Sequence, residues 1–423
     1  MPDSSLRSSN ARLIDALLRE RRLLHWASRA AVTLAALSMA SSWQPIALAQ
    51  SADIPSLTSP LEVDEADPLL PNLIVDRPLS LQEQQALRAS LEQLKRQGER
   101  QYEAGNIPDA FEIWIRELRL RRVLGIQEEV PALSRVGDIA WQENQTLEVR
   151  VIGDRLGEIE QEIRAQPAPD YGLLLQVAES YKTLRDRERA IAAYTTLIQQ
   201  ANQRGDAATE AMALAGLGEV HLAWFDYSPA APVYEQLLAL YQAQQNAIGE
   251  QQALEKLVIV YDETDQAGEA IAARQALIQR YRQAGDLTQV PALKIAVAER
   301  HRQLGQLNAA VQAYQEAIGV AQRLGYLGYA ADAYRGLGYL YQSVDRPQDA
   351  LTAYRFLLDV ERQAYNTYGM MEAFDQMGQI HRSRGATGQA IASFQRGLAL
   401  AQQLSYRTEY FNAQIQGLSA GQP

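Results

Sequence analysis

The chain has 423 residues, of which 47% are hydrophobic and 22% are charged, and its formal net charge is −11. It contains no cysteine, which excludes disulfides, thiol catalysis, thiolate metal sites and a lipid anchor on cysteine. The acidic balance argues against a nucleic-acid partner, because basic side chains hold such a partner.

Residues 1–49 have the pattern of a secretory signal peptide. Four arginines precede the apolar stretch Ala30–Trp43, and small residues follow at Ala47 and Ala49. The apolar stretch is shorter than the roughly 20 residues that span a bilayer. We therefore expect cleavage after Ala49, no stable membrane span afterwards, and export to the periplasm, the thylakoid lumen or the extracellular space. An uncleaved anchor and a cytosolic amphipathic helix are the alternatives.

Residues 50–79 are predicted to be a linker, because five prolines interrupt any helix there. The apolar run at 68–75 favours docking of this linker on the rest of the protein. Ser80 and Glu83 form a predicted capping box, in which each side chain bonds to the other residue's backbone. A long helix should begin there and run toward Gly105.

From this point the sequence repeats with a period close to 40 residues. Three positions carry the repeat: a small or glycine position, an alanine twelve residues later, and an aromatic residue four residues beyond that. The first series is Gly98, Gly137, Ala178, Gly218, Val258, Ala298, Gly338 and Gly378. The second is Ala110, Ala190, Ala230, Ala270, Ala310, Ala350 and Ala390, and the third is Trp114, Tyr194, Tyr234, Tyr314, Tyr354 and Phe394.

Self-similarity at a fixed period is the signature of a solenoid, in which each unit buries its apolar face only by stacking on its neighbours. We expect each unit to be two antiparallel helices. The glycine position lets the second helix approach the first, the alanine lies where the two helices cross, and the aromatic residue packs into the next unit.

The residues of the seventh unit resemble the tetratricopeptide repeat (TPR). Tyr334-x2-Leu337-Gly338-x2-Tyr341, followed by Ala350-x3-Tyr354, is similar to that family's aromatic-x2-Leu-Gly-x2-Tyr and Ala-x3-aromatic pattern. The resemblance covers roughly residues 91–404. It implies an all-α, right-handed superhelical solenoid of about eight helix-turn-helix units over residues 80–404, with a capping helix and tail at 405–423.

Two departures from the family pattern bear on this expectation. The family's usual period is 34, and its closing proline is absent here; the longer form is similar to the repeats of kinesin light chain. The second helix should stop instead at a glycine 27 residues past the repeat position, as at Gly125, Gly205, Gly285 and Gly325. The second unit, residues 126–168, has Val149 in place of alanine, so its second helix is the element that the pattern supports least.

The histidines do not form a predicted metal site. His221, His301 and His381 stand 80 residues apart at one repeat position, where the intervening units have tyrosine. Helices pack about 8–10 Å apart, so histidines two units apart cannot share an ion. The sequence also has no phosphate-binding glycine loop, no GxSxG and no HExxH. We therefore expect no cofactor, no metal and no catalytic residue.

In the TPR family, ligands lie in a concave groove lined by the first helix of each unit. The resemblance implies a partner-binding groove for a protein or peptide in this chain. Carried over position by position, its residues are Tyr102, Trp141, Lys182, Met212, Glu219, Glu255, Ile259, Asp262, Glu263, Glu299, Arg302, Arg335, Tyr339, Gln342 and Arg382.

Two charge patterns mark this predicted groove. Arg302, Arg335 and Arg382 could hold a partner's carboxylate, although pairing with neighbouring acidic residues is the favoured interpretation. The acidic middle units would suit a basic or amphipathic segment.

The sequence thus predicts an exported, non-enzymatic interaction scaffold. The cast of the sequence is also similar to secreted cyanobacterial proteins of this family. The alternatives are an intracellular peptide-sensing TPR regulator and a cryptic hydrolase on a helical scaffold.

Overall fold

The computed structural model describes residues 59–62, 67–70 and 77–419, so the predicted signal peptide and its cleavage site lie outside the described residues. The described part of the chain is helical and contains no strand. Its helices are α2 (Leu81–Glu103), α3 (Ile107–Arg121), η1 (Arg122–Leu124), α4 (Ile126–Gln142), α5 (Thr146–Arg164), α6 (Tyr171–Thr183), α7 (Arg187–Arg204), α8 (Ala207–Ala223), α9 (Tyr227–Ala243), α10 (Ala247–Glu263), α11 (Ala267–Gln283), α12 (Val290–Gln303), α13 (Leu307–Leu324), α14 (Leu327–Ser343), α15 (Pro347–Gln363), α16 (Thr367–Ser383), α17 (Thr387–Leu404) and α18 (Thr408–Ser419).

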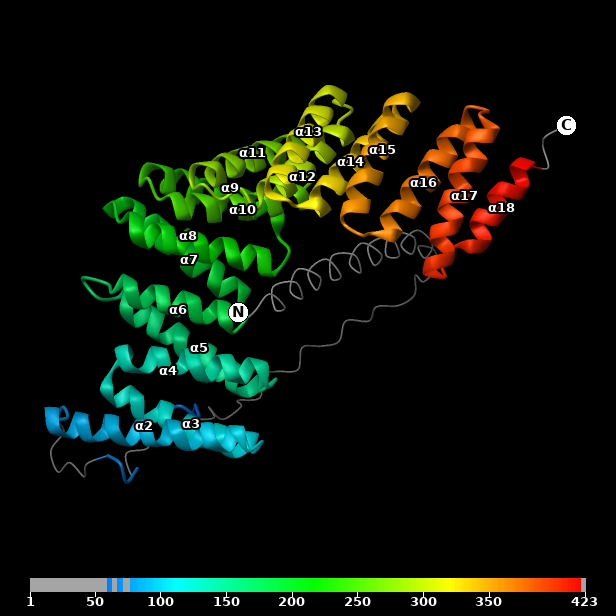
Figure 1. Ribbon diagram of the computed structural model, residues 1–423. Coiled ribbons are helices and arrows are strands. Elements are labelled where there is room, and N and C mark those ends of the chain that lie inside the picture. The colour runs from blue at the N-terminus through cyan, green and yellow to red at the C-terminus, as the bar shows by residue number, and fades with distance from the viewer. Residues whose placement is uncertain (1–58, 63–66, 71–76, 420–423) are drawn as a thin grey trace, which may run out of the picture. The chain divides into compact units, whose positions relative to one another are not determined.

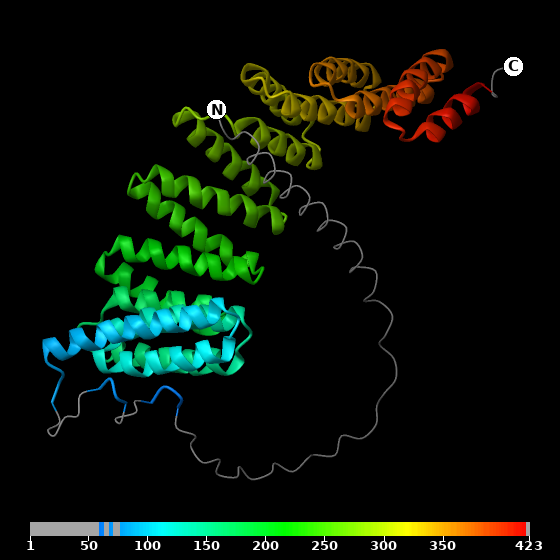
Figure 2. The same cartoon turned by 60° about the horizontal axis from the view of Figure 1, so that its bottom comes forward.

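These helices form an all-α solenoid, as the sequence predicts. Each 40-residue unit is one antiparallel pair, from α2/α3 to α16/α17, and α18 follows the eighth pair. Consecutive helices lie side by side through the array (Figure 1, Figure 2). The first helices of some consecutive units also touch directly, as α4 touches α6 and α12 touches α14.

Left-handed residues end most of the helices. In most units the turn within the pair and the turn to the next pair each contain one residue with a positive φ, and these residues stand about 20 apart. Gly205 and Gly325 cap α7 and α13 in this conformation, which confirms the predicted glycine stops. Gln245, Tyr365 and Ser405 fill the equivalent position in other units without glycine.

The repeat glycine receives the aromatic ring of its own unit. A Cβ atom at Gly338 would lie 2.5 Å from Cζ of Tyr354, far inside the usual carbon–carbon separation. The same ring position also meets the following unit, since a Cβ at Gly336 would lie 2.4 Å from Cε1 of Tyr314. The ring is therefore wedged between the first helices of two consecutive units. The seven alanines of the second series are completely buried at the helix crossings.

The second unit is a regular helix pair, α4/α5, despite its departure from the pattern. Gly153 stands where the aromatic ring belongs, and Val149 is only half-buried. Leu184, at the end of α6, takes up the space instead, because a Cβ at Gly137 would lie 2.7 Å from its Cδ2. An aliphatic side chain from the next unit thus replaces the ring from the unit's own second helix.

Both ends of the array are covered by further packing. The predicted capping box at Ser80 and Glu83 is confirmed. Upstream of it, Leu61 is completely buried and its carbonyl accepts a hydrogen bond from Arg122, while Asp67 pairs with Arg116 at 2.8 Å. At the other end, Phe411 of α18 is completely buried and its ring faces Gly397 of α17.

Candidate functional site

All fifteen predicted groove residues lie on the first helices of their units, from α2 to α16. On a helix, positions three and four apart share one side, so these residues fall into rows. We call two of these rows the first-helix face. One row immediately follows the repeat position: Glu99, Asp138, Glu179, Glu219, Ile259, Glu299, Tyr339 and Gln379. The other is three residues further on: Tyr102, Trp141, Lys182, Leu222, Asp262, Arg302, Gln342 and Arg382.

Large apolar side chains are exposed on or beside this face. Trp141 is 46% exposed, Ile259 is 48% exposed and Tyr339 is 42% exposed. Met212, six residues before the repeat glycine of α8, is 51% exposed. These four side chains come from α4, α8, α10 and α14, so the exposed apolar surface is spread over units two to seven.

A charge ladder crosses the face between the third and fourth units. The Lys182 ammonium lies 2.5 Å from Glu179 on its own helix and 2.7 Å from Glu219 on α8. Burial lowers the pKa of Lys182, but its bonds with the two carboxylates outweigh burial and raise the pKa above the usual value. Lys182 and Glu219 are therefore partners of each other in this structure.

The three arginines of the last units are each engaged separately. Arg302 bonds to Glu299 at 2.7 Å, three residues earlier on α12. Arg335 bonds to Asp332 at 2.6 Å and to the buried Glu361 of α15 at 2.7 Å. The pairing with neighbouring acidic residues that the sequence favours is thus present for these two arginines. Arg382 instead donates to the side-chain amide of Gln414 on α18.

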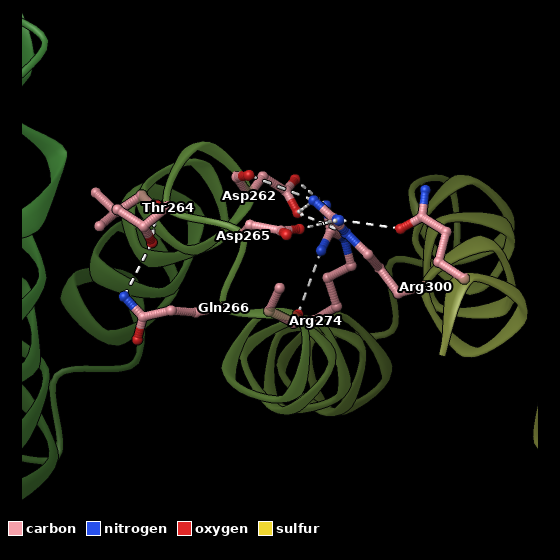
Figure 3. A network of polar contacts seen from close by, with 9 residues as sticks. Asp262, Thr264, Asp265, Gln266, Arg274 and Arg300 are labelled. Atoms are coloured by element: carbon pink, nitrogen blue, oxygen red, sulfur yellow. Dashed lines mark hydrogen bonds and ion pairs between the residues drawn. The ribbon is translucent and has the colours of Figure 1, made fainter. Parts of the chain in front are cut away.

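Asp262 is held by two arginines of the following helices (Figure 3). Its carboxylate accepts from Arg274 of α11 and, at 2.9 Å, from Arg300 of α12. Arg274 is only 7% exposed, and Arg300 also approaches Asp265 at 3.4 Å. Asp262 therefore joins the fifth unit to the sixth, which differs from its predicted place as a groove residue open to a partner.

The other acidic residues of the middle units also have hydrogen-bond or charge partners, apart from the exposed Glu263. Glu255 accepts from the Tyr281 hydroxyl at 3.0 Å and from the Gln251 amide at 3.0 Å. Glu299 accepts from Arg302 and from the Tyr314 hydroxyl. The acidic middle is thus less open than the sequence suggests, and Glu255 is the member whose hydrogen-bond donors are all neutral within the described residues.

The hydroxyls of the repeat tyrosines distinguish the units from one another. Tyr194 donates to Glu179 and Tyr314 donates to Glu299, each bond closing within one unit. Burial raises the pKa of both phenols, and the neighbouring carboxylate raises it further. The buried hydroxyls of Tyr234 and Tyr354 have no hydrogen-bond partner within the described residues.

Shallow depressions lie along the first helices. One of about 440 Å³ spans α4 and α6 and is lined in part by Arg135, Asp138 and Glu179. A second, of about 270 Å³, lies between α8, α9 and α10 beside Tyr234 and Glu255. A third, of about 550 Å³, lies between α14 and α16 and includes Gln342 and Arg382. Together they hold five residues of the two rows.

The histidines do not converge in the described residues, where no group of three or more histidine, aspartate and glutamate side chains could hold a metal ion. His221 and His381 are buried, and burial lowers the pKa of both rings. His301 contacts Gln306 through Nδ1 at 2.6 Å. Among the described helices, none combines the length and apolar character that crossing a membrane requires.

No protein-family model matches the chain, and no curated protein matches it. Solved structures do. BtubC (BKLC) from P. vanneervenii is 19% identical, with 52% of this chain and 92% of that chain covered and a TM-score of 0.36. TPR-like repeats of a putative kinesin light chain from Podosopora anserina are 12% identical, with 45% and 94% covered and a TM-score of 0.36. A signal transduction ATPase with a TPR sensor from Pyrococcus horikoshii is 12% identical, with 74% and 50% covered and a TM-score of 0.41.

The eight helix pairs, with the ring of the second helix set against the small position of the first, follow the pattern that the quoted residues resemble. The described residues form tetratricopeptide-like repeats. The TPR units of this chain keep that contact in units one, four, seven and eight, where glycine faces Trp114, Tyr234, Tyr354 and Phe394.

Sequence reasoning missed Arg274. It stands 16 residues after the repeat position of the fifth TPR unit, where the other units have an aromatic ring or, in the second, glycine. The series of aromatic residues skips this unit, and a cation in a buried register requires a carboxylate partner. That signal could have identified Asp262 as its partner. The open hydroxyl of Tyr234 had no such signal, because it depends on where Lys182 of the preceding unit reaches.

Proposed function

We propose that this chain is an exported, non-enzymatic scaffold that binds a protein or peptide on the first-helix face of its TPR array. The observation that carries the proposal is the exposed apolar set on the first helices: Trp141, Met212, Ile259 and Tyr339. Aromatic residues and methionine are enriched in the cores of protein interfaces, and exposed apolar patches mark interaction sites.

Site-specific photo-crosslinking tests the binding face. A photoreactive amino acid placed at Met212, Ile259 or Tyr339 should yield a defined adduct with a protein from the source cells. Phe356 on the second helix α15 and Leu147 on α5 are matched controls, since they are 51% and 55% exposed and apolar. Equal adduct formation from the second-helix positions would show that the partner does not use the first-helix face.

Export is the second part of the proposal. It is supported by the arginines, the apolar stretch and the small residues of positions 19–49 in the sequence. Mass analysis of the N-terminus of the protein isolated from its source should give a chain that starts at Gln50. A chain that keeps residues 1–49 in the cytosol would favour the intracellular regulator instead.

The absence of catalysis is the third part. Its support is the sequence, which lacks the recognisable nucleophile, metal and phosphate-binding motifs and contains no cysteine. Hydrolase-directed activity probes should leave the purified protein unlabelled. Labelling that is lost on unfolding would revive the cryptic hydrolase.

A further inference from the structure

The depression between α8, α9 and α10 combines an apolar floor with a polar rim. Leu237 and Ala253 are buried beneath it, and the ring of Tyr234 lines it. Two carboxylates and one ammonium belong to its rim: Glu219, Glu255 and Lys256. Its volume of about 270 Å³ suits one long side chain rather than a folded ligand.

Tyr234 leaves this depression chemically incomplete. The side chain is only 2% exposed, and its hydroxyl has no hydrogen-bond partner within the described residues. Its counterparts Tyr194 and Tyr314 donate to the glutamate of the same register, Glu179 and Glu299. The equivalent glutamate of this unit, Glu219, is turned to Lys182 of the preceding unit. An unpaired buried hydroxyl is unfavourable, so a group that bonds to it would stabilise the site.

The charge of the surrounding helices favours a cationic ligand. Residues 207–263, which span α8 to α10, contain eight acidic side chains, whereas Lys256 is the single basic one. Glu255 receives its hydrogen bonds from the neutral groups of Tyr281 and Gln251. The carboxylate at the rim is therefore not neutralised by a bonded cation, and Glu219 shares Lys182 with Glu179.

We propose that this depression binds the guanidinium group of an arginine from the partner protein, an inference that rests on the proposed scaffold function. The aliphatic stem of arginine packs on Leu237 and Ala253, as long charged side chains do on apolar surface. Its five N–H donors meet acceptors from three helices: Glu219 of α8, the Tyr234 hydroxyl of α9 and Glu255 of α10. Lysine, with a compact ammonium, reaches fewer of these acceptors at once, and leucine leaves all of them unmet.

Fluorine NMR of the full chain labelled with 3-fluorotyrosine tests the proposal, with N-acetyl-arginine amide as the probe. The Tyr234 signal is identified by its loss in Tyr234→Phe, and Tyr241 is a second reporter because it also lines the depression. We expect both signals to shift saturably with the arginine amide, while the signal of Tyr194 stays in place. N-acetyl-lysine amide should bind about tenfold more weakly, and N-acetyl-leucine amide should give no saturable shift.

Variants with matched controls identify the acceptors. Glu255→Gln should weaken binding of the arginine amide about tenfold, the effect of losing one charge-assisted hydrogen bond. Glu219→Gln, in a different helix, should weaken it in the same direction and guards against a folding defect in the first variant. Glu263→Gln is the control, because Glu263 is an exposed carboxylate of α10 that does not line the depression.

The outcomes separate this inference from the scaffold function. Equal binding of arginine and leucine amides, or no saturable shift, would overturn the arginine site. If crosslinking from Met212 and Ile259 still captures a partner, the scaffold function stands without the arginine site. If the arginine amide binds but no partner crosslinks to the first-helix face, the scaffold function fails and the depression is a site for a free guanidinium ligand.

Discussion

Arg274 and Asp262 form an ion pair in the one unit whose aromatic register holds a cation. Tyr194, Tyr234, Tyr314 and Tyr354 occupy that register elsewhere and fill the space between consecutive first helices. In the fifth unit the Arg274 guanidinium is nearly as buried, and it reaches Asp262 on the preceding helix. Because Arg300 of the next unit binds the same carboxylate, the pair also joins units five and six.

Removing the Asp262 charge should destabilise the middle of the array. Asp262→Asn leaves a buried guanidinium with no anion, and breaking a buried pair in this way costs about 3–5 kcal/mol. Because the Asp262 side chain is 30% exposed, we expect a loss at the lower end, about 2–3 kcal/mol. Hydrogen exchange in urea, read at α10 to α12, measures this loss.

Asp265→Asn is the matched control for that change. The Asp265 side chain is 91% exposed and lies 3.4 Å from Arg300, so its loss should cost less than about 1 kcal/mol. Equal effects of the two variants would contradict the structural role of Asp262.

Two glycines of α14 should respond oppositely to alanine. A Cβ at Gly338 would meet the Tyr354 ring at 2.5 Å, and such overpacking typically costs about 1–3 kcal/mol. A Cβ at Gly328 would meet nothing within 4 Å, so alanine there should gain up to about 1 kcal/mol from helix propensity. Thermal unfolding of Gly338→Ala and Gly328→Ala should move the midpoint down and up respectively. A stabilising Gly338→Ala would mean that the ring does not sit against this glycine.

The buried histidines should make the array less stable in mild acid. Burial holds the pKa of His221 and of His381 below the usual 6.5; Asp226 opposes the shift at His221, whereas Arg384 and Arg355 add to it at His381. The unfolded chain therefore binds protons first as the pH falls. Stability should be unaffected above about pH 7 and should decline from pH 6.5 downward through the folded pKa values.

Tyrosine variants measure the contribution of each histidine. His221→Tyr and His381→Tyr introduce the residue that Tyr181, Tyr261 and Tyr341 provide in other units. Each should remove part of the decline in urea midpoint between pH 7.5 and 5, and the double variant should remove the sum of both parts. An unchanged slope in the double variant would assign the decline to carboxylates.

The segment before α2 should stabilise the first unit only. Leu61 is completely buried, and replacing such a leucine by alanine costs about 2–5 kcal/mol. In a repeat array, interactions are between neighbours, so Leu61→Ala should speed hydrogen exchange in α2 and α3 and leave α14 to α17 unchanged. Leu81→Ala is the control, since Leu81 is 76% exposed. Uniform acceleration along the array would show that the units unfold together.

Most of the fold follows from local sequence, because the repeat is a sequence property. The period of 40, the small positions such as Gly338 and Gly378, and the buried alanines each specify a helix crossing between near neighbours in the chain. The glycine stops at Gly205 and Gly325 and the capping box at Ser80 are likewise local, since a helix end depends on the backbone of a few residues. The regularity of α5 did not follow, because Leu184 of the next unit fills the place of its missing ring.

The sequence by itself determined which residues face the same side of each first helix, and so placed Trp141, Met212, Ile259 and Tyr339 on one candidate surface. Only the tertiary structure decided which charges remain open there. Asp262 is taken by Arg274 and Arg300, and Glu219 by Lys182, so that the Tyr234 hydroxyl loses its usual acceptor. Pairing between long side chains depends on reach across helices in three dimensions, which a one-dimensional register of 40 residues does not specify.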